Sequence, residues 1–424
     1  MPTSQANLLH SGLPEETRSR LRRLAGTDIV VGVPSYKNTR TIGNVVASVG
    51  LGLGEHFRAS DAVILISDGG STDDTAELAL RAELPDRVSR VVTEYQGTTG
   101  KGSAIRAILE AADIVGAKAC AIIDADVRSI TPGWVERLVA PILSAKADFV
   151  TPVYSRDRHE VTINDMIAYP LTRALYGRDI RQPLGGEIAM SPRAWRLYLN
   201  KDVWETDVAR FGVHIWMTTL AINGGWRLYQ APLGTKTHDY KDPTIGFEPK
   251  FMQIVGTLFR LMQMNRRVWP DIGAAQPVPL WGDLDRLDPE PVPTTRQTLR
   301  DGFKKGARRY RKNLAQILNA DQQHLVEQLL EEGSTTPFPA DDWARLVCDF
   351  AVAYNRGEGD PDKVALSLLP LYYARKASML SQLEGKPWTA VEDAIAKQAA
   401  AFEQHKDYLI DRWVSYLPWQ APVR

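Results

Sequence analysis

The sequence predicts an α/β protein in which helices cover both faces of a mostly parallel sheet, followed by an all-helical C-terminal region. Two observations predict this class. From Asp28 onward, short runs rich in valine and isoleucine alternate with longer helical patterns, and helical periodicity dominates after residue 293. The strand-like runs are continuously apolar, which is typical of strands buried on both faces rather than on one.

The expected strands are separated by helical patterns that begin near Thr41, Thr72 and Ser103. In parallel sheets of this kind, ligands bind at the carboxyl ends of the strands, so the polar motifs that follow the strands are the candidate site. The strands are expected at residues 29–33, 62–66, 91–92, 119–123 and 149–153.

Composition along the chain indicates four segments. The sequence between residues 269 and 293 is rich in proline and aspartate, which is typical of a connector. We therefore expect an N-terminal helical extension (1–27), an α/β domain (28–268), this connector (269–293) and a helical domain (294–424).

Charge and cysteine content exclude several classes of protein. Lysine and arginine total 51, as do aspartate and glutamate. The chain therefore lacks the basic excess that would indicate a nucleic acid polymer as partner. The two cysteines, Cys120 and Cys348, are too few for a disulfide framework and favour a reducing compartment. The first 25 residues lack the apolar core of a secretion signal, and no apolar run is long enough to span a bilayer. Cytoplasm is the expected location.

Asp124-Ala125-Asp126 follows the apolar run 119–123 directly. Alternation along a strand places Asp124 and Asp126 on one side and Ala125 on the other. Two neighbouring carboxylates repel each other unless a cation lies between them and a ligand, so the pair predicts Mg²⁺ or Mn²⁺. An isolated Asp-x-Asp is equally compatible with a solvated or capping pair, and its position after a buried strand favours the metal.

Three further loops follow strands. Val33-Pro34-Ser35-Tyr36-Lys37-Asn38 ends the first strand, and Ser67-Asp68-Gly69-Gly70-Ser71-Thr72-Asp73-Asp74-Thr75 ends the second. Asp68 can accept hydrogen bonds from a ribose or a base, whereas Asp73 and Asp74 are typical helix caps. Gly97-Thr98-Thr99-Gly100-Lys101-Gly102-Ser103 opens a helix and combines glycines with a lysine, which indicates an anion site. It lacks the full phosphate-loop pattern of nucleoside triphosphatases.

These motifs, taken in order with Gln182-Pro183-Leu184-Gly185-Gly186-Glu187, resemble the GT-A-fold glycosyltransferases. More narrowly, they resemble the retaining enzymes of the mannosylglycerate synthase, glucosylglycerate synthase and glucosyl-3-phosphoglycerate synthase group. The resemblance covers about residues 28–250. It implies a nucleotide-sugar-binding and catalytic domain over 28–268 and a helical tail, and it implies a hexosyltransferase activity.

The resemblance also implies roles for the donor-binding residues. Asp68 would lie near the base, Lys101 near the diphosphate, and Asp124 beside the ribose or the donor sugar. Asp126 would bind the metal, with Ala125 beside it and His238 as a distant second ligand; Asp, His and diphosphate oxygens form a reasonable set for Mg²⁺ or Mn²⁺. The nucleoside pocket would be lined by Pro34, Tyr36 and Asn38.

His214 departs from the pattern, because the related enzymes usually carry Asp or Glu at this point near the donor sugar. A neutral imidazole hydrogen-bonds a hydroxyl but supplies no negative charge to an oxocarbenium-like centre. We count Glu187, Asp124 and His214 as the candidate catalytic residues. For Glu187 we favour a role in positioning the substrate over a role as nucleophile.

The segment Tyr154 to Asn164 resembles the acceptor loop of the group. Arg158 and Thr162 are the candidates for holding an acceptor carboxylate, because a guanidinium binds it bidentately and a hydroxyl orients it. Arg156 is the alternative arginine. The remaining candidate substrate-binding residues are Gln182, Leu184, Gly185 and Gly186.

The expected reaction moves glucose or mannose from a nucleoside-diphosphate sugar to glycerate or 3-phosphoglycerate, and the resemblance implies retention of the anomeric configuration. Two alternatives stay open: an inverting transferase acting on another small or glycan acceptor, and a nucleotide-sugar sensor with impaired catalysis. Sugar nucleotidyltransferases are disfavoured because Pro34-Ser35-Tyr36-Lys37 lacks their glycine-rich signature. The donor base and the sugar are not determined, and the apolar helical tail is compatible with a homodimer.

Overall fold

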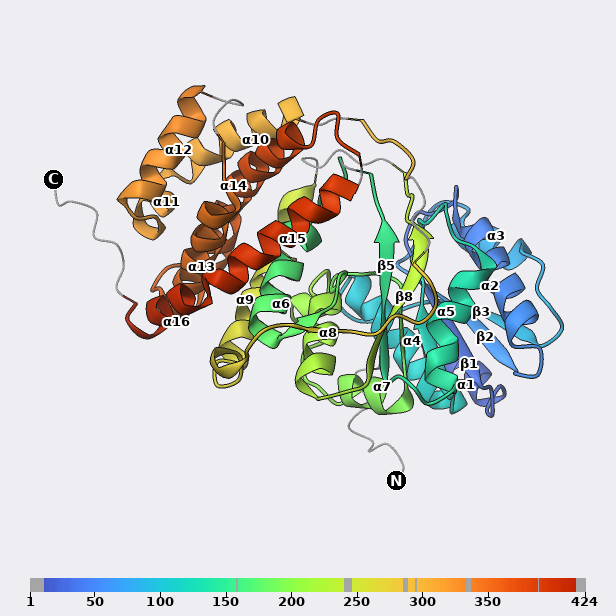
Figure 1. Cartoon of the computed structure of the whole chain (residues 1–424). Coiled ribbons are helices and arrows are strands. Elements are labelled where there is room, and N and C mark those ends of the chain that lie inside the picture. Colours follow the sequence, from blue (N-terminus) through green and yellow to red (C-terminus); the bar gives the residue numbers. More distant parts are fainter. Residues whose placement is uncertain are drawn as a thin grey trace. The chain divides into compact units, whose positions relative to one another are not determined.

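The computed structural model describes residues 11–157, 159–239, 246–284, 289–293, 296–332, 337–387 and 389–416 (Figure 1). It divides into two compact units. The first unit contains Met1–Ser155, Leu184–Asp239 and Val278–Pro289. The second contains Arg156–Pro183, Tyr240–Pro277 and Glu290–Arg424. Each compact unit is assembled from three separate segments of the chain.

The first unit is built on a sheet with the strand order β3-β2-β1-β4-β7-β5-β8 in the described part of the chain. The central pairs β1–β2, β1–β4, β2–β3 and β5–β8 are parallel, and only β7 runs antiparallel to its neighbours β4 and β5. The predicted mostly parallel sheet is confirmed. The strands are β1 Ile29–Ser35, β2 Ala62–Asp68, β3 Val88–Glu94, β4 Ala119–Ile122, β5 Phe149–Ser155, β7 Ile188–Met190 and β8 Leu228–Thr235.

Helices cover both faces of this sheet, as the continuous apolar strands predict. Helices α2 (Ile42–His56) and α5 (Pro132–Leu143) bury their apolar side chains in one core with the odd positions of β1. Helix α4 (Lys101–Val115) packs on the opposite face, where Gly32 makes room for Ile108: a Cβ at Gly32 would lie 2.2 Å from the Ile108 side chain. The unit also contains α1 Glu15–Arg22, α3 Thr75–Arg81, α7 Pro192–Leu199, η3 Asp207–Ala209 and α8 Val213–Asn223.

The second unit is mainly helical, which confirms the predicted helical C-terminal region. The short helix η2 (Asn164–Ala168) and α6 (Tyr169–Tyr176) join it from the middle of the chain. Trp343 Nε1 donates to Met166 O at 2.8 Å, so the C-terminal helices enclose this earlier segment. The other elements are β6 Arg178–Asp179, α9 Phe247–Met264, η4 Trp269–Asp271, β9 Gln276–Pro277, α10 Arg296–Arg309, α11 Arg311–Ile317, α12 Ala320–Glu332, α13 Ala340–Arg356, α14 Pro361–Gln382, α15 Thr389–Gln404 and α16 Lys406–Val414.

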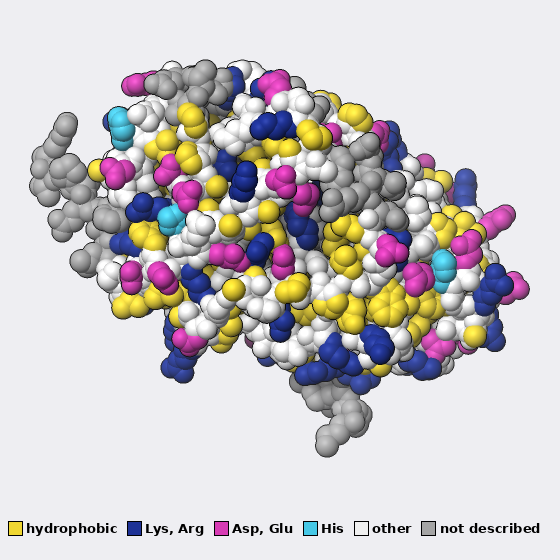
Figure 2. Space-filling model, in the orientation of Figure 1, with side chains coloured by type: hydrophobic (Ala, Val, Ile, Leu, Met, Phe, Trp, Pro, Cys, Tyr) yellow, Lys and Arg dark blue, Asp and Glu magenta, His cyan; other side chains and the backbone are white. Residues whose placement is uncertain are grey.

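Charged side chains of both signs lie on the surface, in keeping with the formal net charge of zero. On the face drawn in Figure 2, basic and acidic side chains are interspersed over most of the surface. Within the described ranges, no helix combines the length and apolar character that a bilayer span requires.

Candidate functional site

The candidate site forms where the carboxyl ends of β4, β5 and β8 meet the amino end of β7. Strand β7 is antiparallel to β4, and Ile122 of β4 pairs with Ile188 of β7. Asp124, two residues after Ile122, therefore lies opposite Gly186, two residues before Ile188. A Cβ at Gly186 would lie 2.2 Å from Asp124 Oδ2. Gly186 is therefore required for this close approach.

A charged network occupies this edge of the sheet. Lys236, directly after β8, donates to both oxygens of Glu187 at 2.7 and 2.8 Å and to Asp124 Oδ2 at 3.0 Å. The Tyr154 hydroxyl donates to Glu187 Oε2, and the ammonium of Lys236 lies 5.2 Å from the centre of the Tyr154 ring. Lys101 binds Asp124 from the other side. The network thus balances two carboxylates with two ammonium groups.

The electrostatics of Asp124 follow from this network. Burial alone would raise its pKa, but the charges of Lys101, Lys236 and His214 outweigh burial and hold the pKa of Asp124 well below its ordinary value. Asp124 is therefore ionised at neutral pH. The expected repulsion between the two aspartates of the motif is relieved at Asp124 by lysines, so this carboxylate needs no metal.

Lys101 is the first residue of α4, and its loop is packed closely. A Cβ at Gly102 would lie 1.9 Å from Val208 O, and one at Gly100 would lie 2.5 Å from Ala209 O. Both positions therefore require glycine, and they fix the start of α4 against η3. The loop places the Lys101 ammonium at a helix N-terminus, where the helix dipole also favours anions.

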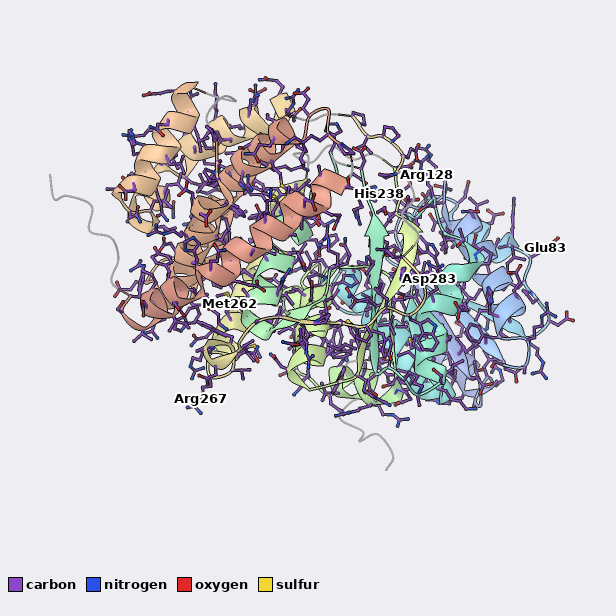
Figure 3. All side chains as sticks on the ribbon, in the orientation of Figure 1. Glu83, Arg128, His238, Met262, Arg267 and Asp283 are labelled. Carbon is purple, nitrogen blue, oxygen red and sulfur yellow. The ribbon has the colours of Figure 1, made fainter. Side chains whose placement is uncertain are left out.

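Asp126 and His238 come from segments that pair with each other. Val127 and His238 form an antiparallel bridge, and Arg128 N donates to Thr237 O at 2.8 Å. Figure 3 shows Arg128 and His238 together beyond the ends of β5 and β8. The turn is also held from α2, because Thr41 Oγ1 donates to Ala125 O at 2.7 Å. Asp126 is thus the sequence neighbour of the residue that pairs with His238.

The protein by itself supplies few metal ligands here. In the part of the chain that the structure describes, no three His, Cys, Asp or Glu side chains are grouped as a metal site. A cation bound by Asp126 and His238 would need further oxygen ligands from another molecule.

The ends of β1 and β2 form the neighbouring wall. Asp68 is buried and accepts hydrogen bonds from Ser35 Oγ at 2.8 Å and from Ser71 N and Oγ at 2.6 and 2.8 Å. Asn38 Oδ1 accepts from Tyr36 N at 2.8 Å, while the Tyr36 side chain is 57% exposed. Asp68 and Asn38 thus shape the loops, and Tyr36 presents an open aromatic surface.

The capping interpretation of the second loop holds for Asp73 but is wrong for Asp74, which is the N-cap residue of α3 and makes no side-chain capping hydrogen bond. Asp73 accepts hydrogen bonds from Thr75 Oγ1 at 2.6 Å, Thr75 N at 3.3 Å and Thr39 Oγ1 at 2.7 Å. The hydrogen bonds from Thr75 and Thr39 lower the pKa of Asp73. This carboxylate holds the start of α3. Pro34 is the residue of β1 opposite Ser67 of β2 and lies within the buried strand, which ends at Ser35.

His214 lies in the first turn of α8 and is buried. Its charge, when protonated, lowers the pKa of Asp124, so the two side chains belong to one electrostatic environment. Glu187 is completely buried. The structure therefore brings the three candidate catalytic residues, Glu187, Asp124 and His214, to the same edge of the sheet.

The expected acceptor residues belong to different units. Thr162 is in the second unit, where its N and Oγ1 donate to Asp165 Oδ2 at 2.8 and 2.9 Å. This pattern holds the start of η2. Gln182 is also in the second unit and is buried, whereas Leu184, Gly185 and Gly186 belong to the first. Arg158 lies outside the described residues.

Lys236 and Tyr154 are site residues that the sequence analysis missed. Lys236 is one residue beyond β8 and only two before His238, and Tyr154 is the second-last residue of β5. Their place at the carboxyl ends of parallel strands is the signal that could have identified them. A lysine and a tyrosine within strand-like sequence carry no further pattern, so neither was distinguished from ordinary strand ends.

The sheet and its site define the class of protein. A mostly parallel sheet with one antiparallel strand, and with charged groups beside the point where the strand order reverses, is the GT-A fold of glycosyltransferases. Residues 30–206 match the family model of glycosyl transferase family 2. This part of the chain is therefore similar to family 2 glycosyltransferase domains, and the match supports a glycosyltransferase activity.

Solved structures of glucosyl-3-phosphoglycerate synthase from Mycobacterium tuberculosis are similar to the chain. The complex with Mg²⁺ and uridine-diphosphate is 25% identical, with a TM-score of 0.43, over 57% of this chain and 82% of that chain. The complex with Mn²⁺, uridine-diphosphate and glucosyl-3-phosphoglycerate is 24% identical, with a TM-score of 0.42, over 58% and 84%. No curated protein sequence matches the chain. At these TM-scores, residue roles are not carried over from the synthase.

Proposed function

We propose that the protein transfers glucose or mannose from a nucleoside-diphosphate sugar to a small acidic acceptor, glycerate or 3-phosphoglycerate, with retention of configuration. The observation that carries this proposal is the network of Lys101, Asp124, Lys236 and Glu187 at the site edge of the sheet, in which Lys236 and Glu187 are buried and Lys101 and Asp124 are partly exposed. Such a network holds a charge-balanced wall of fixed polar groups in place, as a transferase needs in order to stabilise charge that develops during transfer.

The donor would lie with its nucleoside against Tyr36, whose exposed ring can stack on a base. Its diphosphate would reach the start of α4, where Lys101 and the helix dipole favour negative charge. Lys101 already binds Asp124 but has three N–H donors, so it can contact a phosphate oxygen at the same time. Charge building on the departing diphosphate is thereby stabilised.

Asp126 and His238 would hold the divalent cation, since their segments are joined by the bridge between Val127 and His238. When bound, Mg²⁺ or Mn²⁺ supplies positive charge next to the diphosphate. The ligand set leaves coordination positions for diphosphate oxygens. The synthase structures contain Mg²⁺ or Mn²⁺ with uridine-diphosphate, which are the ligand classes proposed here on the chemistry of these residues.

Glu187 and Asp124 would position the sugar rather than attack it. Glu187 is buried and binds Lys236 and Tyr154, so its oxygens are held in place by three N–H or O–H contacts. A carboxylate held in this way is a weak nucleophile and a good fixed charge. The acceptor hydroxyl would attack from the side of the leaving phosphate, which would take its proton.

Replacing Asp126 by asparagine tests the proposal. We expect metal-dependent turnover to fall about 100-fold or more, equivalent to about 3 kcal/mol of transition-state stabilisation, because a metal ligand loses its charge. The measurement is release of nucleoside diphosphate from a panel of uridine- and guanosine-diphosphate sugars with glycerate and with 3-phosphoglycerate. Asp86→Asn removes an exposed carboxylate and is the matched control.

Unchanged turnover of the Asp126 variant would contradict the metal assignment. The anomeric configuration of the product, read by NMR, distinguishes retention from the inverting alternative. A chain that binds nucleotide-sugars but neither transfers nor hydrolyses them with any acceptor would support the sensor alternative, which His214 favours by withholding a negative charge.

A further inference from the structure

A basic pocket lies on the first unit, away from the site. It has a volume of about 270 Å³ and is formed between the last turn of α1 and the amino end of β3. Its lining residues are Arg20, Arg23, Leu24, Ser89 and Arg90. Three of these five residues carry a guanidinium group, and none of the five is acidic.

The contacts of the three arginines leave most of their donors unused. Arg20 Nη2 donates to Arg90 O at 2.7 Å, and Arg90 Nη1 donates to Ala82 O at 2.6 Å. The Arg23 backbone N–H donates to Arg20 O at 3.2 Å, but its side chain makes no hydrogen bond or ion pair with any residue that the structure describes. Each guanidinium has five N–H donors, so the pocket is lined with donors and positive charge.

Other arginines near the pocket form ion pairs with carboxylates. Arg18 and Arg22, on the same helix, both bind Glu15, and Arg87 lies 3.6 Å from Asp61. The pocket arginines instead lie next to one another: burial, and then the charge of Arg20, lowers the pKa of Arg90. Holding like charges together raises the free energy of the pocket unless an anion lies among them.

The lining also indicates which anion fits. Planar guanidinium forks match the oxygens of a phosphate group in pairs, and the Ser89 hydroxyl adds one more donor. Leu24 is the only apolar side chain among the lining residues, and no aromatic ring offers a surface for a nucleobase. A small phosphate monoester is therefore a better match than a nucleotide bound through its base.

The pocket is distinct from the candidate site. Arg90 pairs with Ile64 of β2, whereas Asp68, at the site edge, pairs with Glu94. Four residues along a strand correspond to about 13 Å, so the pocket lies toward the amino ends of β2 and β3, whereas the candidate site lies at the carboxyl ends. Donor and acceptor binding at the site therefore leave this pocket free.

We propose that this pocket binds the phosphate group of a small phosphorylated molecule, and that the bound anion fastens α1 to β3. Helix α1 already runs along this edge strand, because Thr17 Oγ1 and Thr93 Oγ1 are hydrogen-bonded at 2.8 Å. At the far end of the helix Arg20 already donates to Arg90 O, and an anion shared by Arg20, Arg23 and Arg90 would strengthen this attachment. Phosphate binding and the protection of α1 are thus coupled.

The test is titration of the full chain with inorganic phosphate by calorimetry, at ionic strength held constant with chloride. We expect one saturable site that is weakened at least fivefold in Arg23→Gln and lost in the Arg20→Gln, Arg23→Gln double variant. Arg23→Gln removes no side-chain hydrogen bond or ion pair among the described residues, so we expect folding to be retained, which circular dichroism checks. Arg58→Gln, an exposed arginine of the same unit, is the matched control and should bind normally.

A Lys101→Met variant separates this pocket from the proposed diphosphate site, and the phosphate affinity should persist in it. Hydrogen exchange of the α1 amides should slow on adding phosphate to the wild type but not to the double variant. Absence of saturable binding, equal affinity in the double variant, or loss of binding in Lys101→Met would each overturn the proposal. Binding of nucleic acid or anionic vesicles without binding of phosphate would overturn it as well.

Discussion

Lys236 holds the candidate site together at the scale of single residues. Its ammonium group is buried and contacts two carboxylates, Glu187 and Asp124, of which Glu187 is completely inaccessible to solvent. A buried charge is costly unless paired, so each member of the network depends on the others. The same contacts fix the orientation of Glu187 toward the end of β4.

Replacing Lys236 by methionine should destabilise the protein by about 3–5 kcal/mol, because Glu187 and Asp124 then lose a buried partner. The measurement is the free energy of unfolding by urea. In the double variant Lys236→Met, Glu187→Gln, part of the loss should be recovered, since one uncompensated charge is removed. Additive losses in the double variant would contradict the coupling.

Lys376 is a buried lysine on α14 of the second unit, and its protonation should change the free energy of unfolding. Burial lowers its pKa from 10.5 to about 8, and Asp165 and Glu160 oppose that shift only in part. Between pH 8 and 10.5 the unfolded chain binds more protons at this lysine than the folded chain. The contribution of Lys376 to the free energy of unfolding therefore rises with pH over this window.

We predict that Lys376→Met is more stable than the wild type at pH 7 by up to about 3 kcal/mol, the equivalent of the pKa difference. The advantage should shrink as the pH rises from 8 toward 10.5. Unfolding by urea at several pH values measures it, with Lys363→Met, an exposed lysine of the same helix, as control. A pH-independent difference would contradict the assignment.

At the scale of elements, the antiparallel strand β7 decides the geometry of the site. It pairs with β4 and β5 and is only three residues long. Because it runs opposite to its neighbours, its first residues lie at the edge where the carboxyl ends of β4 and β5 emerge. As a result, Leu184 to Glu187, which precede β7, lie at the carboxyl ends of β4 and β5.

Gly186→Ala tests this arrangement. The added Cβ would lie 2.2 Å from Asp124 Oδ2, so Asp124 or the turn must shift. We expect kcat/KM to fall about tenfold or more, with a loss of about 1–3 kcal/mol in stability. Gly43→Ala in α2, where the nearest atom lies at 4.0 Å, should instead be neutral or stabilising by up to about 1 kcal/mol. Equal effects of both substitutions would contradict the close approach.

At the scale of the whole molecule, the second unit is interleaved with the first along the chain. Segments from residues 156–183 and 240–277 pack with the C-terminal helices. The ring centres of Phe251 on α9 and Tyr372 on α14 are 5.4 Å apart, and Trp343 binds Met166 O. The core of this unit therefore needs both the middle and the end of the chain.

A chain ending at residue 293 should consequently fail to fold completely. Removing α10 to α16 exposes the apolar faces of α6 and α9, which are buried in the full chain. We expect strong binding of a hydrophobic dye and loss of cooperative unfolding for the second-unit segments, compared with the full chain. A fully cooperative, dye-free truncated chain would instead support the sequence-based boundary at residue 293.

Much of the first unit could be predicted from sequence because its signals are local. Buried parallel strands such as 29–33 and 119–123 are continuous apolar runs, and the motifs at their ends are contiguous. β7 could not be predicted, since a three-residue strand has no measurable periodicity. The contacts of Lys236 with Glu187 and Asp124 were also beyond prediction, because the partners are 49 and 112 residues away in sequence.

The sequence by itself determined the α/β class and the helical C-terminal region, because these depend on local periodicity, and its contiguous motifs predict the Asp124-Ala125-Asp126 segment as the centre of the site. Only the tertiary structure decided that Asp124 is neutralised by Lys101 and Lys236, that Gly186 must be glycine, and that each unit draws on distant segments. These features depend on which strand ends meet in space, and pairing between strands that are far apart in the chain leaves no trace in local sequence.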